Sequence, residues 1–420
     1  MSEDFNLRSR AYWTKMAWGL FLGLIGAISA LIFILVMSLG QKIFWPYIIN
    51  NWTLFSGPWW IVGLMTAAGL LVGIIHRYSP AQQMDVFGVI VDAKDLDPKP
   101  MPSSVLASLI SLIGGFSLGP EVSTGMLAGG LGSWISKKRK LDSDTSKISV
   151  LSSISGAWSG LFTSPFAMIL MLLESKHKQS VIFYGTLLIA GLAAVIGFAI
   201  FYAFQGLNYA SVLGLLSPPP YHLTLWNLVL SVLLGILAVP VILFFVVLNK
   251  IFGRLVEPLN SKPVIRSTLG GFLLGLLAVV IPTTFGLGTT SMPIVHQQAA
   301  EIGVTLLIIF ALTKLVALSG ALNFGFIGGP IFPLLFVGSC IGDAINRIFP
   351  QIPIGLALGC MMVAVPAALV PIPIALGALS IIIIGLSATN ALPVIIAALV
   401  AFSITHGLLM NGKEETDSRA

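Results

Sequence analysis

The sequence predicts an all-α, polytopic membrane protein. Of its 420 residues 56% are hydrophobic and only 9% are charged, and the mean hydropathy is +0.98. A soluble domain carries roughly 25% charged residues, so these charges are too few to cover a water-soluble globule of this size. Long uncharged runs leave room for roughly ten helical crossings of a bilayer. The absence of short alternating segments argues against an outer-membrane β-barrel.

The charge balance of the chain indicates its membrane orientation. The 22 Lys and Arg residues exceed the 16 Asp and Glu residues, and basic residues gather in cytoplasmic loops of membrane proteins. With the basic N-terminus inside, only Lys42 and Arg347 fall outside, apart from Lys314 within a predicted span. We therefore expect both termini in the cytoplasm, and no nucleic acid partner.

Most apolar segments predict single spans. In chain order these segments cover residues 16–40, 59–75, 148–174, 181–204, 223–249, 268–282 and 303–321. The stretch Ser103–Ser136 differs, because its 34 residues carry a single charge, Glu121, and both flanks are basic. One helix of that length would measure about 51 Å and would end on the wrong side. Two shorter helices that enter the membrane and return fit better.

Two Gly- and Pro-rich segments, residues 114–135 and 323–345, repeat each other. Aligning Gly119 with Gly329 gives a shift of 210 residues, which is half of the chain. By the charge pattern the first segment is flanked on the cytoplasmic side and the second on the opposite side. The two copies are therefore predicted to be inverted.

The repeat defines the expected domain organisation. We expect one transmembrane domain over residues 1–420, with inverted-topology repeats at about 16–205 and 223–412, broken or re-entrant helices and no soluble regulatory domain. Inverted repeats of this kind aim half-helix N-termini at a site near the bilayer midplane. Free N–H groups and the helix dipole there favour an anion. The segments Glu121–Ser123 and Ile331–Phe332 are the predicted donors.

Three motifs resemble those of a known family, the CLC chloride channels and chloride/proton antiporters. They are Gly119-Pro120-Glu121, the segment Gly328–Leu334, and the Gly-rich segment Gly156–Glu174. The resemblance extends from the first span to about residue 412 and is greatest to a bacterial branch of ion-transport proteins. It implies a CLC-like fold, an inner-membrane location, a homodimer in the lipid bilayer and no cofactor. It also implies chloride or another monovalent anion as substrate, with protons as a second substrate in antiporters.

The resemblance assigns Glu121 as the gate. An ionised carboxylate would compete with the anion for the same amides, whereas a protonated one could swing away. A carboxylate in an uncharged membrane segment is functional by default, and the alternative is a side chain that caps its own helix. The anion-binding positions implied beside Glu121 are Gly119, Val122 and Ser123 in the first motif and Gly329, Ile331 and Phe332 in the second.

The chain also departs from the family pattern. The first ion motif would fall at residues 79–83 and is absent, which leaves Ser79 as a weak anion ligand or as a loop or helix-cap serine. The inner proton-carrying glutamate of antiporters matches Ser175, and the late tyrosine has no counterpart. Pro330 stands where a backbone donor is expected and has no N–H.

Other polar residues receive structural interpretations. We expect Glu174 to be an interfacial, solvated charge, and Lys314 to snorkel or to pair with Glu301 rather than to line the pore. His296 has no metal-ligand spacing, and Asp343 is expected at the outer interface. No metal-binding or catalytic residue is assigned.

Three functions remain open at this point. The first is an anion channel or uniporter, which the missing inner glutamate favours. The second is a chloride/proton antiporter with a non-glutamate inner proton route. The third is a membrane scaffold that does not transport. An enzyme is not expected, because the HExxH, GxSxG and Walker patterns are absent from the sequence.

Overall fold

Helices make up the regular structure of the protein in the computed structural model. The structure describes residues 9–45, 55–91, 96–174, 182–205, 216 and 218–417. Within those ranges the elements are α-helices and two short 3-10 turns, and the β-type pairing is one isolated bridge. This agrees with the predicted all-α class.

The first half of the chain contributes α1 to α8. Their bounds are α1 Arg10–Phe44, α2 Trp60–Tyr78, α3 Val86–Val91, α4 Met101–Ile113, α5 Glu121–Lys138, α6 Ser143–Leu161, α7 Pro165–Leu173 and α8 Ile182–Gln205. The predicted break between residues 103 and 136 is confirmed, since α4 and α5 are separate helices.

The second half repeats the order of the first. Its elements are α10 Leu225–Val256, η2 Glu257–Leu259, α11 Pro263–Val280, η3 Pro282–Thr284, α12 Ser291–Gln297, α13 Ala299–Asn323, α14 Ile331–Ile348, α15 Ile354–Ala367, α16 Pro373–Ile384 and α17 Ala391–Asp417. Helices α5 and α14 each have 18 residues, and they begin at the two positions that the sequence repeat aligns.

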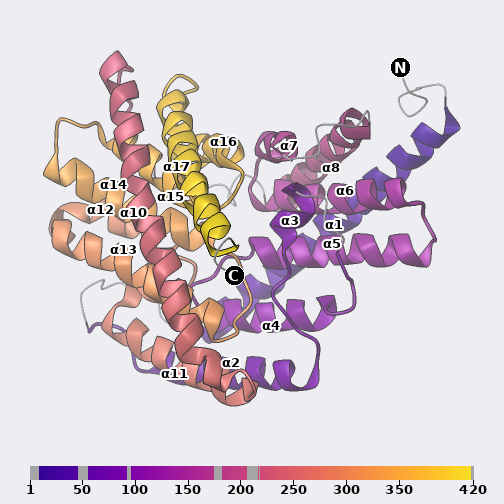
Figure 1. Ribbon diagram of the computed structural model, residues 1–420, viewed down its shortest axis with the longest axis horizontal. Coiled ribbons are helices and arrows are strands. Elements are labelled where there is room, and N and C mark those ends of the chain that lie inside the picture. The colour runs from indigo at the N-terminus through magenta and orange to yellow at the C-terminus, as the bar shows by residue number, and fades with distance from the viewer. Residues whose placement is uncertain are drawn as a thin grey trace.

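The packing pattern is also repeated. Helix α1 crosses α6 and α8, and α10 crosses α15 and α17 in the same way. Among the described helices, the main contacts between the halves are those of α2 along α11 and of α7 against α16. Figure 1 shows α2 beside α11 at the lower edge, with the magenta helices of the first half beside the orange and yellow helices of the second. The loops that begin α5 and α14 meet between these two sets.

The prediction of one span over residues 148–174 is wrong, because this segment forms two helices. Thr163 adopts a positive φ of 52°, which ends α6. Ser164 then starts α7, accepting a hydrogen bond from the N–H of Ala167 at 3.0 Å, and Pro165 occupies the first helical position. A serine N-cap followed by proline is a strong helix start.

Eight helices of the described chain are long and apolar enough to cross a bilayer. Helices α4 and α15 are apolar but shorter, with 13 and 14 residues. The count falls below the roughly ten crossings expected from length, because several segments are half-helices. Small residues let the long helices approach closely: a Cβ at Gly156 of α6 would overlap the backbone of Gly23 in α1, as is common in membrane interfaces.

Candidate functional site

The two Gly-Pro loops cross at the centre of the molecule. Gly119 and Gly329 donate their N–H groups to each other's carbonyl oxygens, both at 2.7 Å. This pairing differs from the expectation that both glycines would offer amides to an anion. The two N–H groups are already engaged, so the glycines join the two halves of the chain. Beneath the crossing, the Phe116 and Phe326 rings stack with centroids 3.5 Å apart.

Glu121 links the two repeats at this crossing. Its side chain is fully buried, and Oε1 accepts a hydrogen bond from the N–H of Ile331 at 2.7 Å. The N–H of Phe332 also faces this carboxyl group. Ile331 and Phe332 begin α14, and the N–H groups of a first helical turn have no partner inside the helix. The acid of the first repeat therefore occupies the donors of the second.

The second carboxyl oxygen of Glu121 has a different environment from the first. Oε2 is buried and has no hydrogen-bond partner among the described residues. A buried carboxylate oxygen without a donor costs free energy. The carboxyl group of Glu121 is thus held by N–H groups at the start of α14, while its Oε2 has no described donor.

Glycine is required on both sides of the carboxyl group. A Cβ added to Gly119 would overlap Oε2 and the rest of the carboxyl group, and a Cβ added to Gly329 would overlap Oε1, Cδ and Cγ. The need here is space rather than a positive φ, because neither glycine is among the positive-φ residues. The two crossing glycines form the slot that admits Glu121.

Trp158 supports the backbone of Glu121, and the sequence analysis did not assign it a role. Its indole Nε1–H donates to the carbonyl oxygen of Glu121 at 2.7 Å, and the ring is fully buried. The hydroxyl of Thr124 donates to the Pro120 carbonyl at 2.9 Å. The only sequence signal for Trp158 is its place in the Gly-rich segment of the third motif.

Serine hydroxyls of α4 contact both Gly-Pro motifs. Ser123, in the first turn of α5, shares a short hydrogen bond with Ser108. One turn further along α4, the Ser111 Oγ accepts from the N–H of Ile327 at 3.3 Å. Val122 is buried beside Ser123. The predicted residues Val122, Ser123, Ile331 and Phe332 are thus gathered around Glu121.

Ser79 does not join this group. Its hydroxyl donates to the Ile75 carbonyl at 2.6 Å and its N–H to the same oxygen at 2.9 Å, so it ends α2 as a cap. The neighbouring Gln83 makes the longer-range contact instead. Its Nε2 donates to the Gly328 carbonyl at 2.9 Å, and its Oε1 accepts from the Gly328 N–H at 3.2 Å. The segment that lacks the expected ion motif therefore braces the second one.

A cavity of about 220 Å³ lies beside the crossing. Pro120 and Phe332, from the two motifs, are part of its wall. The rest combines apolar side chains with hydroxyl and amide groups: Ile34, Met37, Ser38, Gln41, Trp45, Leu161, Leu287, Thr289 and Thr290. None of these lining residues carries a charge, so hydrogen-bond donors are the polar groups that the wall offers to an ion.

Comparison with known proteins identifies the family. The family model described as voltage gated chloride channel matches residues 68–406, which is most of the chain. The chain belongs to the voltage-gated chloride channel (CLC) family. A protein of Salmonella choleraesuis (strain SC-B67) named "Putative ion-transport protein YfeO" is 30% identical over 353 residues, covering 80% of this chain and 82% of that protein. The YfeO of Salmonella newport (strain SL254) is 29% identical with the same coverage.

Solved structures share the fold. A slow cyanobacterial Cl⁻/H⁺ antiporter superposes with a TM-score of 0.71 at 18% identity, covering 96% of each chain. A CLC-type fluoride/proton antiporter also gives 0.71, at 20% identity, covering 93% of this chain and 94% of the other. Family membership and fold together support anion transport by a polytopic membrane protein.

In this CLC protein Lys314 is neither snorkelling nor paired with Glu301. Its side chain is fully buried, and Nζ donates to the carbonyl oxygens of Thr283 at 2.9 Å and Gly286 at 2.7 Å. Glu301 is exposed. The carbonyls of Thr283, in η3, and of Gly286, just after it, hold the ammonium, because burial makes any donor without an acceptor costly. Gly286 in turn donates its N–H to the Gly115 carbonyl at 2.7 Å, so Lys314 ties this loop to the segment before Glu121.

Glu174 is not the solvated charge that was expected. Its carboxylate accepts hydrogen bonds from the N–H groups of Ile374 at 2.7 Å and Ala375 at 2.9 Å, at the start of α16. A carboxylate at a helix N-terminus satisfies free donors and the dipole. Glu174 thereby joins α7 to α16 across the two repeats. Ser175, the predicted inner proton position, lies outside the described residues.

Asp343 lies inside the protein rather than at its interface. Its carboxylate is 2% exposed, and Oδ1 contacts Nδ1 of His296 at 2.7 Å. His296 belongs to α12 and Asp343 to α14. The described residues contain no group of three or more potential metal ligands. The pair therefore fastens α12 to α14. Helix α12 follows the cavity-lining residues Thr289 and Thr290, and α14 is the helix whose first N–H groups bind the Glu121 carboxylate.

Proposed function

We propose that the protein transports chloride or another monovalent anion through a pathway gated by Glu121, as a channel or uniporter. The observation that carries the proposal is the hydrogen bond between the Glu121 carboxylate and the N–H of Ile331. A negatively charged side chain there occupies the donors that a dehydrated anion needs. Movement of Glu121 would release them.

The chemistry of the crossing suits an anion that must also leave. An anion that enters a low-dielectric site loses hydration, so the site must replace those hydrogen bonds. Backbone N–H groups and helix dipoles do so without a full positive charge, which keeps binding weak enough for release. Ile331 and Phe332 of α14 and Val122 and Ser123 of α5 are the donors that we assign. Gly119 and Gly329 keep the two turns together.

We further propose that both termini lie in the cytoplasm. Helix α5 begins at Glu121 and ends at Lys137 and Lys138, and basic ends stay inside. The cavity beside Pro120 then opens toward the outside, and external protons reach Glu121 through it. The bacterial inner membrane is the expected location. A homodimer with one pathway in each subunit is the expected assembly.

Anion/proton exchange is the second candidate, because Glu121 is a carboxyl group placed on the anion's own donors and can carry a proton when it moves. The two functions differ in one measurable property. An exchanger drives protons uphill when a chloride gradient is supplied, whereas a channel does not. A scaffold would show neither flux.

Flux in liposomes tests the proposal. Purified protein is reconstituted, and efflux of chloride, fluoride and nitrate is recorded together with internal pH for the wild type, Glu121→Gln and Glu121→Ala. We expect anion flux in the wild type that rises as external pH falls, and a larger flux without pH dependence in both variants. The exposed Glu301→Gln is the matched control and is expected to behave as wild type. Unchanged flux and pH dependence in the Glu121 variants would refute the gate.

A further inference from the structure

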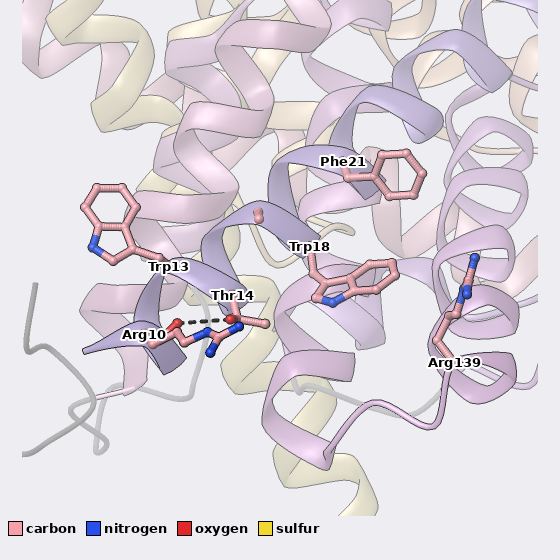
Figure 2. Close-up of a pocket in the computed structure, with 7 residues that line it drawn as sticks. Arg10, Trp13, Thr14, Trp18, Phe21 and Arg139 are labelled. Atoms are coloured by element: carbon pink, nitrogen blue, oxygen red, sulfur yellow. Dashed lines mark hydrogen bonds between the residues drawn. The ribbon is translucent and has the colours of Figure 1, made fainter. Parts of the chain in front are cut away.

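Among the described residues, Lys314 is the only Lys or Arg that is buried. Basic side chains elsewhere reach the surface: Figure 2 shows Arg10 and Arg139 on opposite sides of Trp18, and both arginines are exposed. Dissolved salt screens exposed charges, whereas a buried charge is screened much less. The Lys314 ammonium can therefore act over a distance at which surface charges are weak.

The contacts of the Lys314 side chain favour its charged form. An ammonium has N–H donors and no acceptor, and Nζ donates to the carbonyl oxygens of Thr283 at 2.9 Å and Gly286 at 2.7 Å. Nζ also stands over the Phe336 ring, 5.2 Å from its centroid, and the face of an aromatic ring attracts a cation. Within the described part of the chain no carboxylate forms an ion pair with it. The protein supplies no negative charge there to cancel the positive one.

The two elements that hold Lys314 continue into the walls of the cavity beside the crossing. Phe336 lies one turn along α14 from Phe332, which lines the cavity. A Cβ added to Gly288 would lie 2.8 Å from the Cβ of Phe336, so the loop after Gly286 packs on this helix. The same loop supplies the lining residues Leu287, Thr289 and Thr290. Lys314 therefore lies behind the cavity wall rather than in it.

The distance from the ammonium to the cavity sets how strongly its charge acts there. One helical turn separates Phe336 from Phe332, and Nζ is 5.2 Å from the Phe336 centroid, so an anion against Phe332 is on the order of 10 Å from Nζ. A unit charge at that distance, in an effective dielectric constant of about 20, strengthens anion binding by about tenfold. The lining residues carry no charge of their own, so this contribution has no competitor in the wall.

We propose that Lys314 supplies the fixed positive charge that draws a monovalent anion into the cavity beside Glu121. It acts through the wall and does not touch the anion, whose direct partners remain hydroxyl and backbone N–H groups. A site must bind an ion firmly enough for entry and weakly enough for exit, and a charge set back from the pathway meets both needs. The inference rests on the proposed function, because it concerns the affinity of the same anion pathway.

Variants that change the charge at Lys314 test this inference. All are made in a Glu121→Gln parent, because the ammonium would attract the Glu121 carboxylate as well as the anion. Lys314→Gln keeps N–H donors for the two carbonyls and removes the charge, whereas Lys314→Arg keeps the charge. Lys250→Gln removes an exposed lysine of α10 and is the matched control. The readouts are the chloride concentration that gives half-maximal flux in liposomes and the Kd of chloride for the detergent-solubilised protein, from titration calorimetry.

We expect Lys314→Gln to raise the half-saturating chloride concentration and the Kd by about tenfold, as the loss of a unit charge at this distance implies. The maximal flux should change less. Lys314→Arg and Lys250→Gln should match the parent. A lysine that only holds the loop would affect the yield of folded protein and the maximal flux, and would leave the concentration dependence where it was.

A second pair of variants leaves Lys314 in place. Cys340 of α14 is buried and lies within electrostatic range of the ammonium. Cys340→Asp adds a carboxylate at nearly the same side-chain volume, so it should cancel the positive charge and raise the half-saturating concentration as Lys314→Gln does. Cys340→Ser is the neutral control and should match the parent. This pair carries the test if Lys314→Gln does not fold.

Three results would overturn the inference. They are a folded Lys314→Gln protein with the chloride affinity of the parent, an equal loss of affinity in Lys314→Arg, which would indicate shape rather than charge, and an equal loss in Lys250→Gln, which would indicate surface charge in general. Failure of the proposed function gives a different result. The parent would then bind chloride without carrying it, and calorimetry would still compare the Lys314 variants. A wild type and parent that neither bind nor carry chloride would overturn both proposals.

Discussion

Replacing Gly119 by alanine should open the pathway while Glu121 stays in the sequence. A Cβ at Gly119 would overlap the carboxyl group of Glu121, and the three nearest atoms that it would meet all belong to that group. The carboxyl group is the end of a flexible side chain, so the cheapest adjustment is to move Glu121 away. The reciprocal bonds between Gly119 and Gly329 use backbone atoms only, so the crossing itself should persist.

The size of the effect follows from the contact that is lost. The hydrogen bond from Ile331 N–H to Oε1 measures 2.7 Å, and a hydrogen bond to a charged group contributes about 1.5–3 kcal/mol. Losing it shifts the ratio of closed to open Glu121 by about 10- to 150-fold. Anion flux should rise by up to that factor when opening limits transport. It should not exceed the flux of Glu121→Ala, which has no gate.

Chloride efflux from liposomes measures this prediction. Gly63→Ala is the matched control, because a Cβ at Gly63 of α2 meets nothing within 4 Å. The combined variant Gly119→Ala/Glu121→Ala adds a double-mutant cycle, which isolates the coupling between two residues. We expect Gly63→Ala to match wild type and the combined variant to match Glu121→Ala.

Two outcomes would refute the reasoning. One is a folded Gly119→Ala protein with flux equal to or below that of wild type. The other is an increase in flux that is just as large when Glu121 is already alanine, because the alanine would then act without displacing the carboxylate. Size-exclusion chromatography of each variant before reconstitution separates a change in flux from a loss of fold.

Three further predictions concern residues that stabilise the scaffold. Lys314→Met should lower the thermal stability of the detergent-solubilised protein by about 2 kcal/mol or more, because two buried carbonyls lose their donor. Glu174→Ala should cost about 1 kcal/mol, since the first N–H groups of α16 lose their acceptor. Asp142→Ala should cost about 0.5–1 kcal/mol near neutral pH. The hydrogen bonds from Thr145 hold the pKa of Asp142 below its ordinary value of 3.8, so this stabilisation is present above that pH and is lost as the pH falls through the lowered pKa.

Each of these predictions has a contrary outcome. A Lys314→Met protein as stable as wild type would show that the buried ammonium is dispensable to the η3 loop. Equal melting temperatures for Glu174→Ala and wild type would mean that α7 and α16 are joined by packing alone. For Asp142, a stability difference that grows as the pH falls below 3.8 would contradict the sign derived from its lowered pKa. Thermal unfolding in one detergent, followed by intrinsic fluorescence, serves all three.

The sequence alone determined the class, the repeat and the position of the acid. Scarce charge requires burial in lipid, because the chain could not cover a soluble surface. The 210-residue offset and the basic flanks of residues 103–136 predict two half-helices there, and α4 and α5 are those helices. Glu121 was evident as a lone carboxylate in an apolar stretch, and such a charge is costly enough to be functional. Composition, charge and spacing are local properties, so they can be read along the chain.

The tertiary structure decided which groups meet Glu121. The contact with Ile331 spans 210 residues, the brace from Gln83 to Gly328 spans 245, and Glu174 reaches α16 across 200. In each of these contacts one partner is a backbone group. Every residue type supplies a carbonyl, and every type except proline an N–H, so the sequence does not show which residue provides the backbone partner. The sequence also left two roles open for Ser79, because a serine hydroxyl can bind an anion or cap a helix end. Only the folded chain placed the Ile75 carbonyl within its reach.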